Sequence, residues 1–343
     1  MRIASAPAEQ LPPEHVSFES WLFRASPLGA AATSGLIFAL GAGGFILVSA
    51  LAGYALVGPT GLALDRIVPG VVSPLLLATA LGLRRYVDLK QRADTPAFAA
   101  ILSNDSAVRT ALLRPASSAN MLPASLAGAV AGAVVAFVSV PASLYRDHPT
   151  VFFWQSGLIV MLCALFARSA TLAARNGRNL KRIIDEGLRI ELLHADRLAV
   201  IGRQSARNAL VWLTFAAILC LYFVGGGDPG WPTLPILVVC MGIGLVIFLH
   251  PMSGVRRRIR AAKSAELDRV RDEIGEASRC EARDPAAAAR LPGLIAYEAR
   301  VHAVREWPFD QSTLLRFAAY VLIPAIPWFG QAVASDVIQR LAH

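Results

Sequence analysis

Acidic and histidine side chains recur at helical spacing near the end of the chain. Glu298, His302 and Glu306 stand four residues apart, so a helix would place them on one face. Glu191 and His194 form one ExxH motif. Carboxylate and imidazole groups bind metal ions, but helical di-metal sites combine two ExxH motifs with further glutamates. Because the sequence supplies a single motif, we expect solvated helix faces here, with no metal site and no bound cofactor.

The familiar catalytic motifs do not occur in this sequence. The glycine-rich stretch 41–44 has Ile46 where the GxGxxG dinucleotide loop requires its third glycine. The chain has no GK[ST] of a phosphate-binding loop, no HExxH and no GxSxG. These absences favour a protein that is not an enzyme.

The composition points to a membrane protein. The chain has 343 residues, of which 55% are hydrophobic and 17% are charged. Soluble domains have about 45–50% apolar and about 25% charged residues. Six runs without Asp, Glu, Lys, Arg or His approach or exceed the roughly 17–25 residues that cross a bilayer. They predict an all-α, polytopic transmembrane bundle. The runs lie at 28–57, 67–83, 122–144, 151–167, 209–224 and 234–249.

The last apolar segment, 317–330, is different. It is apolar for fourteen residues, and Pro324 and Pro327 interrupt it. At about 1.5 Å per residue it is too short for a hydrocarbon core of about 30 Å. We expect a broken helix that begins after Arg316 and packs against the bundle before Gln331. A kinked seventh span remains the alternative.

The basic residues predict the orientation. Of 33 lysines and arginines, six lie in 84–121, nine in 168–207 and twelve in 256–305, whereas the intervening loops hold only Arg66 and Arg146. By the positive-inside rule, the N-terminus and the long loops are cytoplasmic. Only three of the basic residues are lysine, which is typical of GC-rich bacterial coding and indicates a bacterial inner (plasma) membrane.

This orientation divides the chain into four regions. Residues 1–27 form a cytoplasmic N-terminal segment, and the six-span bundle occupies 28–249, with cytoplasmic linkers at 84–121 and 168–207. Residues 250–312 carry a charged cytoplasmic hairpin, and 313–343 form the broken membrane segment. In the hairpin we expect two antiparallel helices of the coiled-coil type. Its second helix has Leu294, Tyr297, Val301 and Val304 on one face.

Small residues recur every fourth position in the third span. A helix places them on one face, where a second helix can approach closely. That helix could belong to another subunit of a homo-oligomer or to the same chain. The four helix-packing residues are Ala124, Gly128, Gly132 and Ala136.

A basic cluster follows the sixth span directly. Such clusters bind anionic lipid headgroups, or they simply fix the topology. A nucleic-acid partner is disfavoured, because no aromatic residues are interleaved for base stacking. The five residues are Arg256, Arg257, Arg258, Arg260 and Lys263.

Two stretches resemble a known group of proteins. They are 251–267 (PMSGVRRRIRAAKSAEL) and 305–316 (REWPFDQSTLLR), followed by the proline break at 324–328. The pattern resembles a family of uncharacterised prokaryotic multi-pass inner-membrane proteins. The resemblance implies the topology and carries no activity, ligand or catalytic residue.

Three functions remain open from the sequence. The favoured one is a non-enzymatic assembly or sensor protein that presents the cytosolic hairpin to a partner or to its own copies. The alternative is a channel or transporter that uses the broken C-terminal helix. A membrane enzyme acting on lipid is the least favoured. In all three, the lipid bilayer is the surrounding partner.

Overall fold

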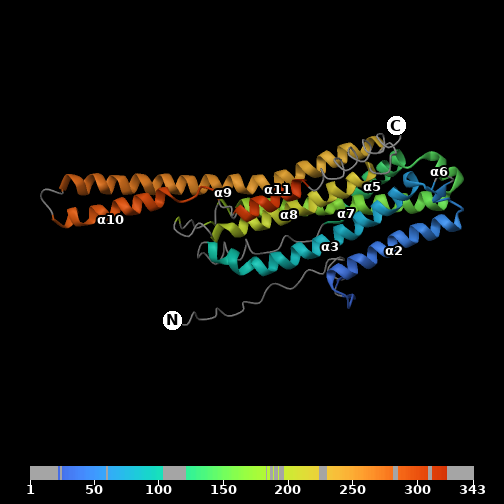
Figure 1. Cartoon of the computed structure of the whole chain (residues 1–343), viewed down its shortest axis with the longest axis horizontal. Helices are drawn as coiled ribbons and strands as arrows, with labels where there is room; N and C mark the ends of the chain where they lie inside the picture. Colours follow the sequence, from blue (N-terminus) through green and yellow to red (C-terminus); the bar gives the residue numbers. More distant parts are fainter. Residues whose placement is uncertain are drawn as a thin grey trace, which may run out of the picture.

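The computed structural model contains the six membrane-spanning helices that the apolar runs predict (Figure 1). They are α2 (Ala30–Leu51), α3 (Leu64–Ile101), α5 (Leu122–Ser139), α7 (Pro149–Arg182), α8 (Ala199–Leu219) and α9 (Gly230–Cys280). The all-α, six-span fold is therefore confirmed. The structure describes residues 22–23, 25–58, 61–102, 121–182, 184–185, 188, 192, 197–223, 230–280, 285–307 and 311–322.

The remaining elements are short or lie beside the spans. They are the antiparallel pair β1 (Val57–Gly58) and β2 (Gly61–Leu62), the helix α6 (Ala142–Asp147), the 3-10 turn η3 (Cys220–Phe223), and the helices α10 (Pro285–His302) and α11 (Gln311–Leu322).

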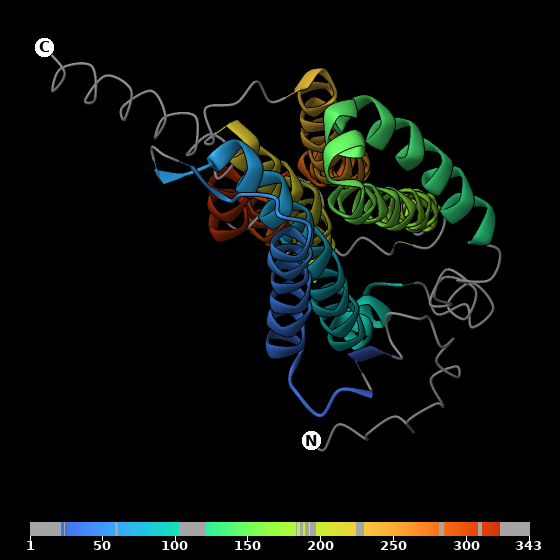
Figure 2. The same cartoon turned by 90° about the vertical axis from the view of Figure 1, so that its right-hand side faces the viewer.

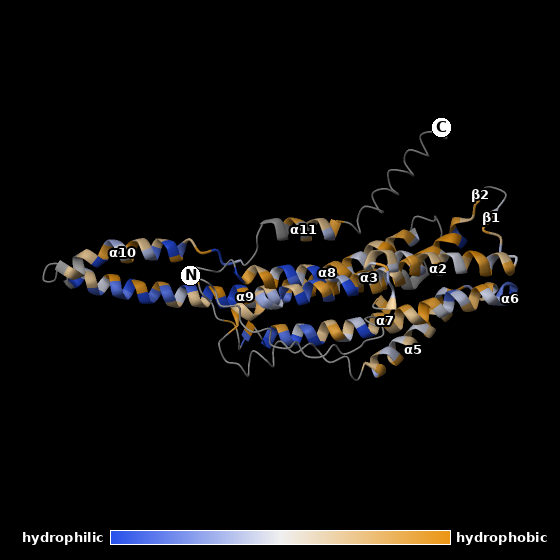
Figure 3. Ribbon diagram, turned by 90° about the horizontal axis from the view of Figure 1, so that it is seen from below, coloured by the Kyte–Doolittle hydropathy of each residue, from blue (hydrophilic) through white to orange (hydrophobic). Residues whose placement is uncertain are grey.

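Three of the helices are much longer than the apolar runs. At about 1.5 Å per residue, α3 measures about 57 Å, α7 about 51 Å and α9 about 77 Å, against a hydrocarbon core of about 30 Å. They continue because the residues that follow each apolar run are mostly good helix formers such as Ala, Leu, Arg and Lys. Hydrophobic residues predominate in the part of the bundle away from the hairpin, whereas hydrophilic residues are frequent in the hairpin and in the neighbouring ends of α7 and α8 (Figure 3). We call the polar side the basic end, defined by Arg84, Lys181, Arg207 and Arg256.

Two of the spans end earlier than the sequence predicts, and local backbone features explain both ends. The first span ends at Leu51, because Gly53 adopts a left-handed conformation with φ of 63°. The N–H of Tyr54 donates to Ser49 O at 2.8 Å, and the N–H of Gly53 donates to Ala50 O at 3.2 Å. This pair of bonds is a Schellman motif, which satisfies carbonyls that a helix end leaves free.

The third span ends at Ser139 instead of 144. Pro141 fixes its own φ and has no N–H, so it opens the short helix α6 in place of a continued span. Polar contacts then tie the turns of this end together. His148 Nδ1 lies 2.9 Å from Ala52 O, and Arg66 donates to Ala55 O at 2.9 Å.

The helix α8 lies at the centre of the bundle, and α2 and α5 lie at its edges (Figure 2). More than half of the span in α8 is buried by protein, compared with 11% for α2 and 17% for α5. The two edge helices therefore present most of their surface to lipid.

The predicted small-residue face of α5 packs against α7 of the same chain. Gly128, Gly132 and Ala136 are buried, and Ala124 is partly buried. A Cβ atom on Gly128 would lie 2.5 Å from Cys163 O, and one on Gly132 would lie 2.7 Å from Val160 Cα. The two backbones thus approach too closely for any side chain at either glycine. Of the two partners that the sequence left open, another subunit or a helix of the same chain, the structure shows the helix of the same chain.

At the basic end, the helices that leave the membrane build an apolar core of their own. Its members come from α3, α7, α8, α9 and the residues between α7 and α8. Beside it, Arg207 of α8 pairs with Asp94 of α3 through a charge-assisted hydrogen bond that is mostly buried. The cluster consists of Phe98, Ile101, Leu180, Ile184, Leu198, Val200, Ile201, Met252, Val255 and Ile259.

We expect Gly132→Leu to destabilise the bundle by about 1–3 kcal/mol or more, because the new side chain would overlap α7. Gly157→Leu is the matched control: it makes the same change on α7, where an added Cβ meets open space. Thermal unfolding in detergent measures both. Equal midpoints for the two variants would contradict the close packing of α5 on α7.

Candidate functional site

The helices α9 and α10 form an antiparallel hairpin that extends away from the bundle (Figure 1). Val301 on α10 and Val270 on α9 are fully buried between them. Leu294 and Tyr297 of α10 are partly buried, as is Val304 just after the end of this helix. The face that the sequence predicts is therefore the one that packs on α9.

Polar side chains link the two helices along this seam. Tyr297 donates its hydroxyl hydrogen to Glu266 at 2.8 Å, and Arg271 donates to Glu298 at 2.8 Å. Arg269 reinforces the first link by donating to Glu266 at 2.6 Å. The Arg269 hydrogen bond, followed by that from Tyr297, lowers the pKa of the Glu266 carboxyl. The ionised carboxylate is therefore the form that the hairpin holds.

Lys263 fastens the end of α10 to α9. Its ammonium group donates to His302 O at 2.6 Å and to Val304 O at 2.9 Å. Both acceptors belong to the last turn of α10 and the residues after it, where helix carbonyls lack intrahelical partners. Lys263 thus acts as a C-terminal cap supplied by the neighbouring helix.

Two further residues of the basic cluster also bind the chain itself. Arg256 lies 3.7 Å from a carboxylate oxygen of Glu306, and its guanidinium lies 4.6 Å from the ring centroid of Trp307. Arg257 lies 4.0 Å from Asp185. Together with Lys263, three of the five lipid-headgroup candidates therefore have partners within the protein. Arg258 and Arg260 remain the candidates for contact with headgroups.

The candidate metal ligands are not brought together. Glu298 and Glu306 face Arg271 and Arg256, respectively. Among the described residues, no group of three His, Cys, Asp or Glu side chains could hold a metal ion. Glu191 and His194 lie outside the described residues.

The first part of the predicted C-terminal membrane element is the helix α11, which packs on α8. Phe317 is buried and stacks on Phe248 of α9, with ring centroids 3.6 Å apart and planes 9° from parallel. The proposed break lies outside the described residues, which exclude Pro324, Pro327, Gln331 and the side chain of Arg316.

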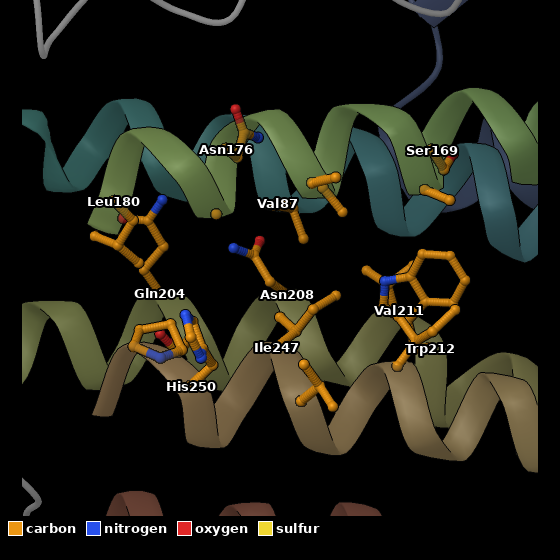
Figure 4. A pocket seen from close by; sticks show the side chains of 18 of the residues that line it. Val87, Ser169, Asn176, Leu180, Gln204, Asn208, Val211, Trp212, Ile247 and His250 are labelled. Atoms are coloured by element: carbon orange, nitrogen blue, oxygen red, sulfur yellow. The ribbon is translucent and has the colours of Figure 1, made fainter. Parts of the chain in front are cut away.

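A cavity of about 710 Å³, which the sequence analysis did not anticipate, lies between α3, α7, α8 and α9 at the basic end (Figure 4). Asn208 reaches into the space between α7 and the α8–α9 pair. Gln204 and His250 line one end, and Trp212 lines the other. The cavity therefore changes from polar to apolar along its length.

The sequence contains a weak signal for this cavity. Gln204 and Asn208 stand four residues apart and so share a face of α8. On α7, the facing wall is built from small residues such as Ala170, Ala173 and Gly177, which leave space. Neither pattern alone distinguishes a cavity from ordinary helix packing, because the space depends on how far apart α7 and α9 lie.

The fold and these sites define a polytopic helical membrane protein with a protruding hairpin. Comparison with protein-family models, with curated proteins and with solved structures finds no match for this chain.

We expect Lys263→Met to loosen α10 by about 1–2 kcal/mol, because two charge-assisted hydrogen bonds to free carbonyls are lost. Amide hydrogen exchange in α10 should then accelerate by roughly 5–30-fold. Lys90→Met, an exposed lysine of α3, is the control. Unchanged exchange in α10 would show that Lys263 does not hold the hairpin closed.

Proposed function

We propose that this protein is a non-enzymatic assembly or sensor protein of a bacterial inner membrane. It displays the α9–α10 hairpin in the cytoplasm, where the hairpin binds a protein partner or a second copy of the chain. The N-terminus and the long linkers lie on the same side, as the distribution of basic residues suggests. The resemblance to prokaryotic multi-pass inner-membrane proteins agrees with this location.

The membrane span and the first arm of the hairpin are a single helix, and this continuity is the main support for the proposal. The 51 residues of α9 run without interruption from Gly230 to Cys280. Because span and arm belong to one helix, a partner that binds the hairpin acts on the same element that packs in the bundle. This geometry suits a platform or a sensor.

The surface of α10 supports a binding role. Its inner face is occupied by α9, whereas its outer face is solvent-exposed and includes Ile295, which is 50% exposed. An exposed apolar side chain on an otherwise unoccupied helix face is typical of a contact position in an interface. The channel alternative depends on Arg316, Pro324, Pro327 and Gln331. Three of these lie outside the described residues, as does the side chain of Arg316, so this alternative remains a prediction.

Photocrosslinking in cells tests the proposal. A photoreactive amino acid at Ile295 should give a discrete protein adduct, whose mass distinguishes a partner from a second copy. The same probe at Ile46, which is 55% exposed on α2 within a predicted span, should label lipid. Val301→Asp should abolish the adduct at Ile295, because a buried charge opens the hairpin seam.

Two results would contradict this function. One is the absence of any protein adduct at Ile295 in cells that produce the full-length chain. The other is an adduct that survives Val301→Asp, which would mean that the folded hairpin is not what the partner recognises.

A further inference from the structure

We infer that the cavity between α3, α7, α8 and α9 binds one anionic phospholipid from the surrounding bilayer. The headgroup lies at the basic end of the cavity, and an acyl chain lies along its apolar wall. This site is separate from the hairpin and does not depend on the function proposed above.

The size and lining of the cavity suit an amphiphile. Its volume of about 710 Å³ falls within the range of about 300–1,000 Å³ that is common for ligand sites. Val211, Trp212, Phe215, Ile243 and Ile247 form the apolar part. A water-soluble ligand would leave this apolar wall in contact with water. An acyl chain covers the wall and so avoids the free-energy cost of exposing apolar surface to water.

The cavity is accessible from the lipid phase. Val239 and Val246 line it, and they are also 51% and 62% exposed on the surface of α9. Both lie within a predicted membrane span. The apolar wall is therefore continuous with the lipid-facing surface, so that a lipid can enter sideways without leaving the bilayer.

The polar end carries an excess of positive charge. Arg84, Arg178 and Lys181 line it together with a single carboxylate, Asp88. Asp88 lies 3.5 Å from Arg84. Within the part of the chain that the structure describes, neither Arg178 nor Lys181 pairs with a carboxylate. Basic pockets between membrane helices bind anionic headgroups, so this arrangement favours a lipid with net negative charge.

Uncharged polar groups complete the headgroup end. Gln204 and Asn208 on α8 provide amide donors, and both line the cavity. Amide donors of this kind satisfy the phosphate and glycerol oxygens of a headgroup.

Fluorescence quenching by brominated lipid tests the site. The protein is reconstituted in phosphatidylcholine with increasing amounts of chain-brominated phosphatidylglycerol or chain-brominated phosphatidylcholine. The quenching of Trp212 is obtained by subtracting the fluorescence of the matching Trp212→Phe variant from the fluorescence of each protein. We expect brominated phosphatidylglycerol to quench Trp212 at a lower mole fraction than brominated phosphatidylcholine does. For equal quenching, the mole fraction of phosphatidylglycerol should be lower by about five-fold or more.

Two matched pairs of variants locate the effect. Lys181→Gln should reduce the preference for phosphatidylglycerol by about five-fold, and Lys90→Gln should not. Gly242→Phe should abolish quenching of Trp212 by either lipid, because an added side chain there extends into open space along the cavity wall. Gly43→Phe makes the same change on α2 in open space away from the cavity, and should have no effect.

Equal quenching by the two lipids in the unmodified protein would overturn the recognition of an anionic headgroup. Quenching that is the same with and without Trp212 would overturn access of lipid to the cavity. If Gly242→Phe fails to fold, the comparison of Lys181→Gln with Lys90→Gln still decides: equal lipid preference in these two variants would also refute the site.

Discussion

The hydrocarbon core of the bilayer offers no partner to backbone N–H and C=O groups, and the rest of this structure depends on that constraint. Each crossing must be a helix that satisfies its own hydrogen bonds. The chain meets this requirement six times, and the apolar surface of α2 and α5 then faces lipid at little cost. In the part of the chain that the structure describes, irregular backbone lies at the ends of the spans, where Gly53 and Pro141 close the helices and polar groups such as His148 satisfy the free carbonyls.

Packing follows different physics inside and outside the membrane. Within it, lipid chains solvate apolar side chains as well as protein does, so helices associate through close contact at small residues. Gly128 and Gly132 against α7 are the clearest case, and Gly44 against Trp154 is another. Beyond the membrane, water restores the hydrophobic effect. There, Met252, Val255 and Ile259 are completely buried, and they anchor α9 where it leaves the bundle and becomes the hairpin.

The sequence predicts the features that depend on local patterns. Six spans follow from apolar length, and the inner face of α10 follows from the spacing of Tyr297 and Val301. The sequence does not reveal features that depend on distant segments. The predicted boundary between the sixth span and the hairpin lies at residue 250, yet α9 continues through it and through Pro251. The cavity exists because α7 and α9 are separated in space. Arg256 and Lys263 find their partners because α10 folds back along α9. No local sequence pattern encodes either arrangement.

One unbroken helix joins the membrane bundle to the hairpin, and a spin-label distance along α9 measures this continuity. Labels replace the exposed residues Leu245 and Glu276 of α9 in the full-length protein in lipid bilayers. A continuous helix places these positions about 47 Å apart, at about 1.5 Å per residue, and predicts a single narrow distance distribution. A broad distribution, or one centred well below that distance, would show that the helix breaks near Pro251 and that the hairpin is not joined to the bundle by a continuous helix.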